Sequence, residues 1–173
     1  MKKIDQQILE ERLCYEFSDA KLLEEALTHS SLSQKGSLER LEFLGDRVLG
    51  LCISDIIFKR FPKEPEGDLA KRFTELVRKE SCADVARALN LGEFLQMTKT
   101  EELQGGREKE SLLADACEAL IGALYLDGGY KCVHDMISRF WGEQIDAMKE
   151  PPKDAKSALQ EYLQGRRQPA PTY

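Results

Sequence analysis

Apolar residues recur at helical spacing along almost the whole chain, and no stretch alternates in the way that marks a half-buried strand. Pro62 and Pro65 are expected to end one helix and make a corner, because proline cannot continue a helix. Glycines after Asp127 are expected to end another with a left-handed cap. Polar residues 98–110 are expected to form a mobile loop. The pattern therefore predicts an all-α protein, with helices over residues 4–15, 19–28, 38–61, 66–79, 81–89, 111–126 and 130–148.

The length of 173 residues suits one domain with a full hydrophobic core and a short appendage. We expect that domain over residues 1–149, a stiff linker with two prolines over 150–155, and the start of a further helix in 156–173. No apolar run reaches transmembrane length, so no membrane association is expected. Five cysteines without a CxxC pair indicate buried free thiols in a reducing cytoplasm.

Three acidic residues of the helix predicted over 38–61 share one face. Glu39, Glu42 and Asp46 lie within an arc of roughly 60°, given about 100° per residue. Like charges stacked in this way weaken a helix, so another interaction must offset the repulsion. The helix also has an apolar flank, which predicts partial burial, formed by Leu41, Leu44, Val48, Leu51 and Cys52.

A second helix repeats the pattern with Asp115 and Glu118, which stand among apolar residues. A carboxylate in such surroundings is expected to be paired or bound to a metal ion. Gly122 lies on the same face and Gly45 lies beside Glu42, so we expect the two helices to approach closely there. Glu66, just after the proline corner, is a candidate further contributor to the same cluster.

Hard oxygen ligands without nearby histidine or thiolate suit Mg²⁺ or Mn²⁺ and not zinc. One or two such ions could activate water and stabilise the leaving oxygen of a phosphodiester. The alternative is that each acid is simply solvated. The net charge of −6 is unusual for an RNA-binding protein, but six of the 31 acidic residues belong to this cluster and the other 25 equal the 25 basic residues. Charge alone therefore excludes neither interpretation.

Three segments together resemble the bacterial ribonuclease III family: residues 26–31, residues 39–49 (ERLEFLGDRVL) and residues 105–129. The resemblance covers essentially the whole chain. It implies the all-helical endonuclease domain of that family, followed by the first helix of an incomplete α/β double-stranded-RNA-binding domain. It also implies a cytoplasmic homodimer that cuts double-stranded RNA, leaves 5′-phosphate and 3′-hydroxyl ends, and matures ribosomal and messenger RNA.

The resemblance gives each acidic position a role. It implies that Mg²⁺, with Mn²⁺ able to substitute, is bound by Glu42, Asp46, Asp115 and Glu118. Within that set, Asp46 and Glu118 match the positions usually described as catalytic, and the accessory acidic positions that place RNA and water match Glu39 and Glu66.

Further matched positions concern the partner molecules. Phe43 matches an aromatic knob that enters a socket on the other subunit. The positions that reach the RNA minor groove match Gln160, Glu161 and Gln164. The chain departs from the pattern at Leu38, a frequent asparagine, and at Arg47, a usual small residue, where an ion pair with Asp46 could tune the site.

Several residues have two interpretations. Lys71 and Arg78 could bind phosphates or form a solvated helix face, and Arg107 could reach RNA or belong only to a mobile loop. His29 is expected to be structural and not a general base. Two other functional classes fit the sequence less well. A non-catalytic RNA-binding scaffold would usually have lost an acidic ligand, and a di-iron bundle needs Glu-x-x-His pairs, which neither His29 nor His134 supplies.

Overall fold

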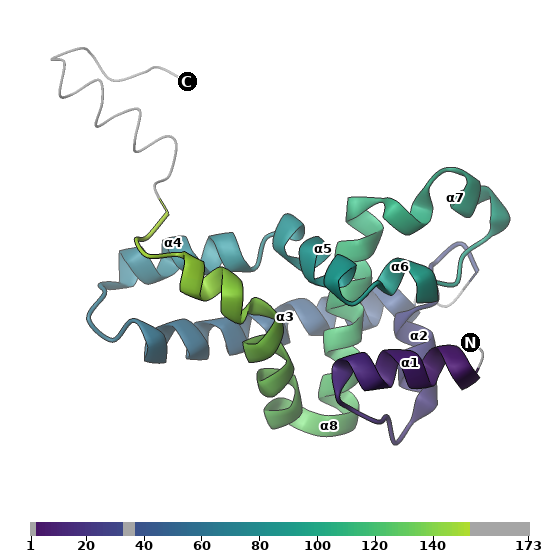
Figure 1. The fold of residues 1–173 in the computed structure, drawn as a ribbon, viewed down its shortest axis with the longest axis horizontal. Helices are drawn as coiled ribbons and strands as arrows, with labels where there is room; N and C mark the ends of the chain where they lie inside the picture. The colour runs from purple at the N-terminus through teal and green to yellow at the C-terminus, as the bar shows by residue number, and fades with distance from the viewer. Residues whose placement is uncertain (1–2, 33–36, 153–173) are drawn as a thin grey trace, which may run out of the picture.

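The computed structural model describes residues 3–32 and 37–152 (Figure 1). All regular secondary structure in these ranges is helical, apart from one isolated bridge between Thr28 and Gln96, so the predicted all-α class is confirmed. The elements are α1 (Lys3–Leu13), α2 (Ala20–Ala26), α3 (Ser37–Arg60), α4 (Glu66–Leu76), α5 (Lys79–Ala88), α6 (Leu91–Phe94), α7 (Lys99–Leu103), a 3₁₀ turn (Gly106–Glu108) and α8 (Glu110–Ala147).

The centre of the fold is the packing of α8 against α3, which is the most extensive contact between any two of these helices. Figure 1 shows α8 passing across α3, bending, and returning toward α4. Helix α5 packs along α8, and α2 contacts both central helices. Their shared core includes Trp141, which is fully buried and donates its indole N–H to the Leu76 carbonyl at 2.9 Å.

The bend in α8 lies where the sequence predicted a break. Gly129 has φ 73° and ψ −175°, so its positive φ agrees with the expected glycine, but its ψ is not that of a left-handed cap. The carboxylate of Asp127 accepts hydrogen bonds from the Tyr15 hydroxyl and from the backbone N–H groups of Ser18 and Asp19. The bend is therefore tied to the connection between α1 and α2.

The polar segment 98–110 corrects one prediction, because much of it is ordered. Thr98 caps α7 by accepting from the Glu101 N–H at 3.4 Å, and a 3₁₀ turn follows. Arg107 donates to the carbonyls of Gly92 and Leu95 at 2.7 and 2.9 Å. The Arg107 hydrogen bonds reach residues 12 and 15 positions earlier, outside the polar segment, so helical periodicity could not reveal them.

Two expectations about burial were also wrong. Leu51, placed in the apolar flank of α3, is 58% exposed, and Cys14 is an exposed thiol at the end of α1. All five cysteines are free, as expected, and three of them are buried: Cys52, Cys82 and Cys117. None of the helices in the described ranges combines the length and apolar character needed to cross a lipid bilayer.

Candidate active site

Two glycines bring the acidic helices into backbone contact. A Cβ atom built on Gly45 of α3 would lie 1.7 Å from the carbonyl oxygen of Glu118 on α8. A Cβ atom built on Gly122 of α8 would lie 2.3 Å from the carbonyl oxygen of Leu41 on α3. Any side chain at either position would overlap the other helix, so the close approach predicted from the sequence is confirmed. The crossing lies at the level of the acidic residues.

Glu118 interacts electrostatically with the other carboxylates at the crossing of α3 and α8. Its pKa is raised to about 7, first by burial and then by three neighbouring carboxylates, those of Asp46, Glu42 and Asp115. A carboxyl group in such a place loses its proton reluctantly, because it is removed from water and surrounded by like charge. Two carboxylates of α3, each more than seventy positions from Glu118 in sequence, therefore act on this carboxyl group of α8.

Glu42 and Asp115 also have raised pKa values. Burial raises the pKa of Glu42, and Asp115, Glu39 and Asp46 raise it further. Burial also raises the pKa of Asp115. Lys79, at the start of α5, opposes both shifts. This lysine supplies positive charge to the acidic cluster, a role that sequence reasoning missed because nothing in its spacing links it to either helix.

The carboxylates are not already arranged as a metal-binding site. Within residues 3–32 and 37–152, no three side chains of His, Cys, Asp and Glu are grouped so that they could hold a metal ion. Asp46 is paired with the guanidinium of Arg47, the ion pair that the sequence suggested. The donor chemistry nevertheless fits a hard divalent cation, because oxygen ligands that repel one another in a buried place gain most from a shared positive charge.

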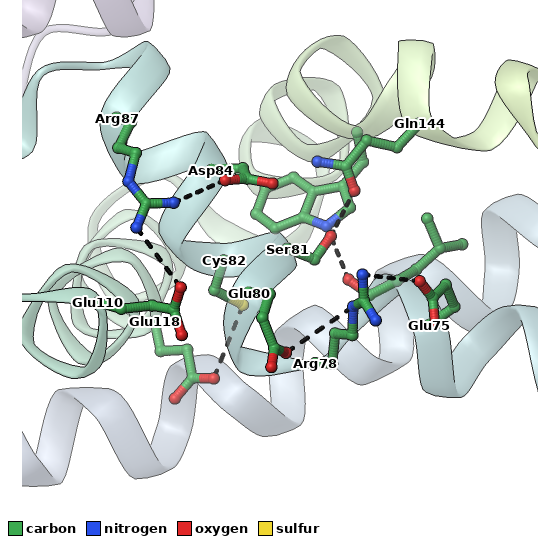
Figure 2. Close-up of polar contacts among 12 residues, drawn as sticks. Glu75, Arg78, Glu80, Ser81, Cys82, Asp84, Arg87, Glu110, Glu118 and Gln144 are labelled. Atoms are coloured by element: carbon green, nitrogen blue, oxygen red, sulfur yellow. Dashed lines mark hydrogen bonds and ion pairs between the residues drawn. The ribbon is translucent and has the colours of Figure 1, made fainter.

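Cys82 is the contact that sequence reasoning missed entirely. Its thiol donates to Oε1 of Glu118 at 3.8 Å (Figure 2). Cys82 lies on the buried face of α5, which packs along α8. The sequence predicted only a buried free thiol here, since Cys82 is 36 positions from Glu118 and belongs to no recognisable motif.

The other predicted acids and bases have different surroundings. Glu66 is the first residue of α4, and its charge contributes to none of the shifts of Glu42, Asp115 and Glu118. Lys71 pairs with Asp68 at 2.8 Å. Arg78 pairs with Glu75 at 2.8 Å (Figure 2). Each pair is partly exposed, so both cations lie on the surface of the domain.

The last group of predicted residues has mixed surroundings, and the charge of His29 lowers the pKa of Asp115. Arg107 pairs with Glu102 at 2.7 Å besides holding backbone carbonyls. Nδ1 of His29 accepts from the Ser31 N–H at 3.2 Å, which agrees with a structural histidine. Phe43 is 66% exposed, with the Arg47 guanidinium 5.3 Å from its ring centroid. The residues expected in the minor groove lie outside the described ranges: Gln160, Glu161 and Gln164.

An all-α domain with acidic side chains around a glycine-lined helix crossing fits one class of protein, the helical nucleases that use a divalent metal ion. Residues 19–144 match the ribonuclease-III-like family model. The chain is 50% identical over 165 residues to ribonuclease 3 of Jannaschia sp. (strain CCS1), covering 94% of this chain and 73% of that protein. The chain therefore belongs to the ribonuclease III family.

Solved structures agree with this assignment. The nuclease domain of ribonuclease III from Campylobacter jejuni is similar with a TM-score of 0.78 and 44% identity, over 89% of this chain and 100% of that domain. A second structure of that Campylobacter domain gives a TM-score of 0.77 and 45% identity, over 80% of this chain and 97% of the other. The similarity confirms the predicted helical endonuclease fold, and the chain is accordingly a nuclease.

Proposed function

We propose that this chain cleaves double-stranded RNA as an endonuclease, by hydrolysis at the acidic crossing of α3 and α8, leaving 5′-phosphate and 3′-hydroxyl ends. One observation carries the proposal: the pKa of Glu118 is raised to about 7, first by burial and then by carboxylates from both helices. A fold does not keep such repulsion in a buried place without a compensating ligand. The relatives that share this fold are named ribonuclease 3.

Four residues are proposed to hold the metal ion: Glu42, Asp46, Asp115 and Glu118. A bound Mg²⁺, for which Mn²⁺ could substitute, would supply an activated water and charge stabilisation at the leaving oxygen. Glu118 must give up its proton when the cation is held, and Asp46 could offer its Oδ1, since Arg47 pairs with Oδ2. Lys79 favours the ionised forms of Glu42 and Asp115, because its charge lowers the pKa of both. Asp46 and Glu118 are assigned the catalytic role on the family resemblance.

The proposed RNA contacts surround this centre. Glu39 and Glu66 are assigned to positioning water and RNA. Cations on the surface of the domain could contact phosphates, as most protein–nucleic acid hydrogen bonds do; the candidates are Lys71, Arg78 and Arg107. Gln160, Glu161 and Gln164, assigned on the family resemblance, would add minor-groove contacts to A-form RNA, where shape is read more than sequence. We place the activity in the cytoplasm, in the maturation of ribosomal and messenger RNA.

We also propose that the nuclease domain works as a homodimer. Phe43 is 66% exposed, and a hollow of about 770 Å³ lies next to it, lined by Leu22, Glu25, Glu39, Arg40, Leu41, Phe43, Leu44 and Leu126. An exposed aromatic side chain beside an apolar hollow is self-complementary across a two-fold axis. One of the Campylobacter structures concerns a region involved in dimer formation. Phe43 of one subunit would enter the hollow of the other.

Cleavage of a long perfect RNA duplex tests the proposal. The parental protein should cut it with Mg²⁺ and should stop when EDTA is in excess. Glu118→Gln should still bind the duplex but cut it at least ~100-fold more slowly, because it lacks a ligand charge. Glu143→Gln, at an exposed position on the same helix, is the matched control and should cut at the parental rate. If Glu118→Gln also cuts at the parental rate, the site assignment is wrong.

A further inference from the structure

Cys82 is a buried thiol that touches the active-site carboxylate of Glu118. We propose that Cys82 is a positioning residue of the nuclease site: its thiol hydrogen bond orients Glu118 so that the other carboxylate oxygen faces the acids of α3. The inference rests on the proposed function, since it assigns Cys82 a part in the same cation site.

The contact is direct and exclusive. Sγ of Cys82 lies 3.8 Å from Oε1 of Glu118 (Figure 2). Within the described residues this thiol is the one hydrogen-bond donor to Glu118, so Oε2 has no protein partner. A carboxylate with one oxygen occupied by a neutral donor keeps its negative charge and its second oxygen for a cation. Second-shell hydrogen bonds of this kind commonly fix the orientation of metal-binding side chains.

The position of the thiol is itself fixed by contacts on both sides of it along α5. Before Cys82, the Ser81 hydroxyl is hydrogen-bonded to Oε1 of Gln144, in the second half of α8. After Cys82, the guanidinium of Arg87 lies 3.5 Å from Glu110, at the start of α8 (Figure 2). Helix α5 is therefore anchored to both ends of α8, and Cys82 cannot shift along Glu118 without breaking one anchor.

The chemistry of a thiol suits this task. A lysine or arginine at position 82 would pair with Glu118 and compete with a cation, whereas a neutral thiol does not. Cys117 lies behind Cys82, and the pKa of Cys117 is raised by a hydrogen bond with Cys82 and by burial. Cys82 is fully buried, so solvent does not compete for its hydrogen bond.

The test compares Cys82→Ala, which removes the donor, with Cys82→Ser, which keeps one. Cys52→Ala is the matched control, because Cys52 is an equally buried thiol on α3 that does not contact Glu118. Binding of Mn²⁺ without RNA is measured from the rise in Tm with Mn²⁺ concentration. Cleavage of an RNA duplex at saturating Mn²⁺ gives kcat and KM. The cleavage assays are run at a temperature well below the lowest Tm among the variants.

We expect Cys82→Ala to weaken Mn²⁺ binding and lower kcat by roughly three- to tenfold, with KM for RNA unchanged, since a thiol is a weak donor among second-shell groups. Cys82→Ser should restore Mn²⁺ binding and kcat to within about twofold of the parental values. Cys52→Ala should lower Tm but change neither Mn²⁺ binding nor kcat. The inference is overturned if Cys82→Ala matches Cys52→Ala in Mn²⁺ affinity and kcat, or if Cys82→Ser is as impaired as Cys82→Ala. Glu118→Gln in parallel separates the two ideas: if it cuts like the parent, the proposed function itself fails.

Discussion

Gly45 of α3 and Gly122 of α8 meet backbone to backbone. A Cβ atom on Gly45 would lie 3.0 Å from the amide nitrogen of Gly122, and one on Gly122 would lie 3.2 Å from the nitrogen of Gly45. Glu42 and Asp46 lie on either side of Gly45 in α3, and Glu118 lies one turn before Gly122 in α8. The distance between the acidic side chains is therefore set by two residues that have no side chain.

Gly45→Ala should separate the two helices. The new methyl group would lie 1.7 Å from the Glu118 carbonyl oxygen, a backbone atom that cannot rotate away. We expect a loss of more than ~3 kcal/mol in the free energy of unfolding, beyond ordinary overpacking, and loss of duplex cleavage. Urea denaturation measures the first effect and a duplex cleavage assay the second.

Two alanine substitutions at other glycines control for this experiment. Gly142 of α8 has no atom within 4 Å of a built Cβ, and Gly50 of α3 meets only the Phe73 ring at 3.5 Å. Gly142→Ala should stabilise the protein by about 0.5–1 kcal/mol, because alanine favours a helix, and both variants should keep activity. Parental stability in Gly45→Ala would contradict the backbone contact.

The pKa of Glu118 predicts a pH-dependent stability without metal. Its folded value of about 7 lies above the ordinary value of ~4.3, so the folded state binds the proton more tightly. The stability that this proton contributes is complete below about pH 4 and is lost as the pH rises through about 7. In EDTA, the parental Tm should fall between pH 5 and pH 8 more steeply than that of Glu118→Gln. Glu143→Gln should follow the parental curve; equal slopes for all three proteins would refute the shift.

Surface cations offer a test of the RNA contacts. Lys71→Gln and Arg78→Gln should weaken duplex binding and reduce the salt slope of log K by about one unit each if their charges meet phosphates. Lys131→Gln, whose lysine pairs with Asp135 at 2.6 Å on the far part of α8, is the control. Unchanged slopes in the first two variants would leave Lys71 and Arg78 as solvated ion pairs.

The sequence predicted the architecture well because each long helix buries one face. Both acidic helices, the glycine contact and the break near Gly129 follow from spacing within single segments. The ion pair of Arg47 with Asp46 was also predictable, since the two residues are neighbours. The resemblance to ribonuclease III rested on the same local segments.

The remaining features depend on contacts between segments, which spacing does not reveal. Cys82 and Lys79 reach the acids only because α5 packs along α8. Arg107 stabilises its own segment through carbonyls of residues 12 and 15 positions away. Leu51 was predicted to belong to the apolar flank of α3 but is exposed, because helical periodicity does not tell which apolar residues the other helices cover. Long-range packing, and not local propensity, decides these roles.

Phe43→Ala should weaken self-association and, through it, cleavage. A fully buried phenylalanine contributes about 1.5–3 kcal/mol, and a two-fold interface loses that contribution twice. We therefore expect the dimer dissociation constant, measured by sedimentation equilibrium, to rise at least ~100-fold. Cleavage should fall at low protein concentration and recover as the concentration rises, which a damaged active site would not do. Leu103→Ala removes an 88% exposed leucine on α7 and should change neither property. Identical sedimentation of the Phe43→Ala and parental proteins would show that Phe43 does not hold two subunits together.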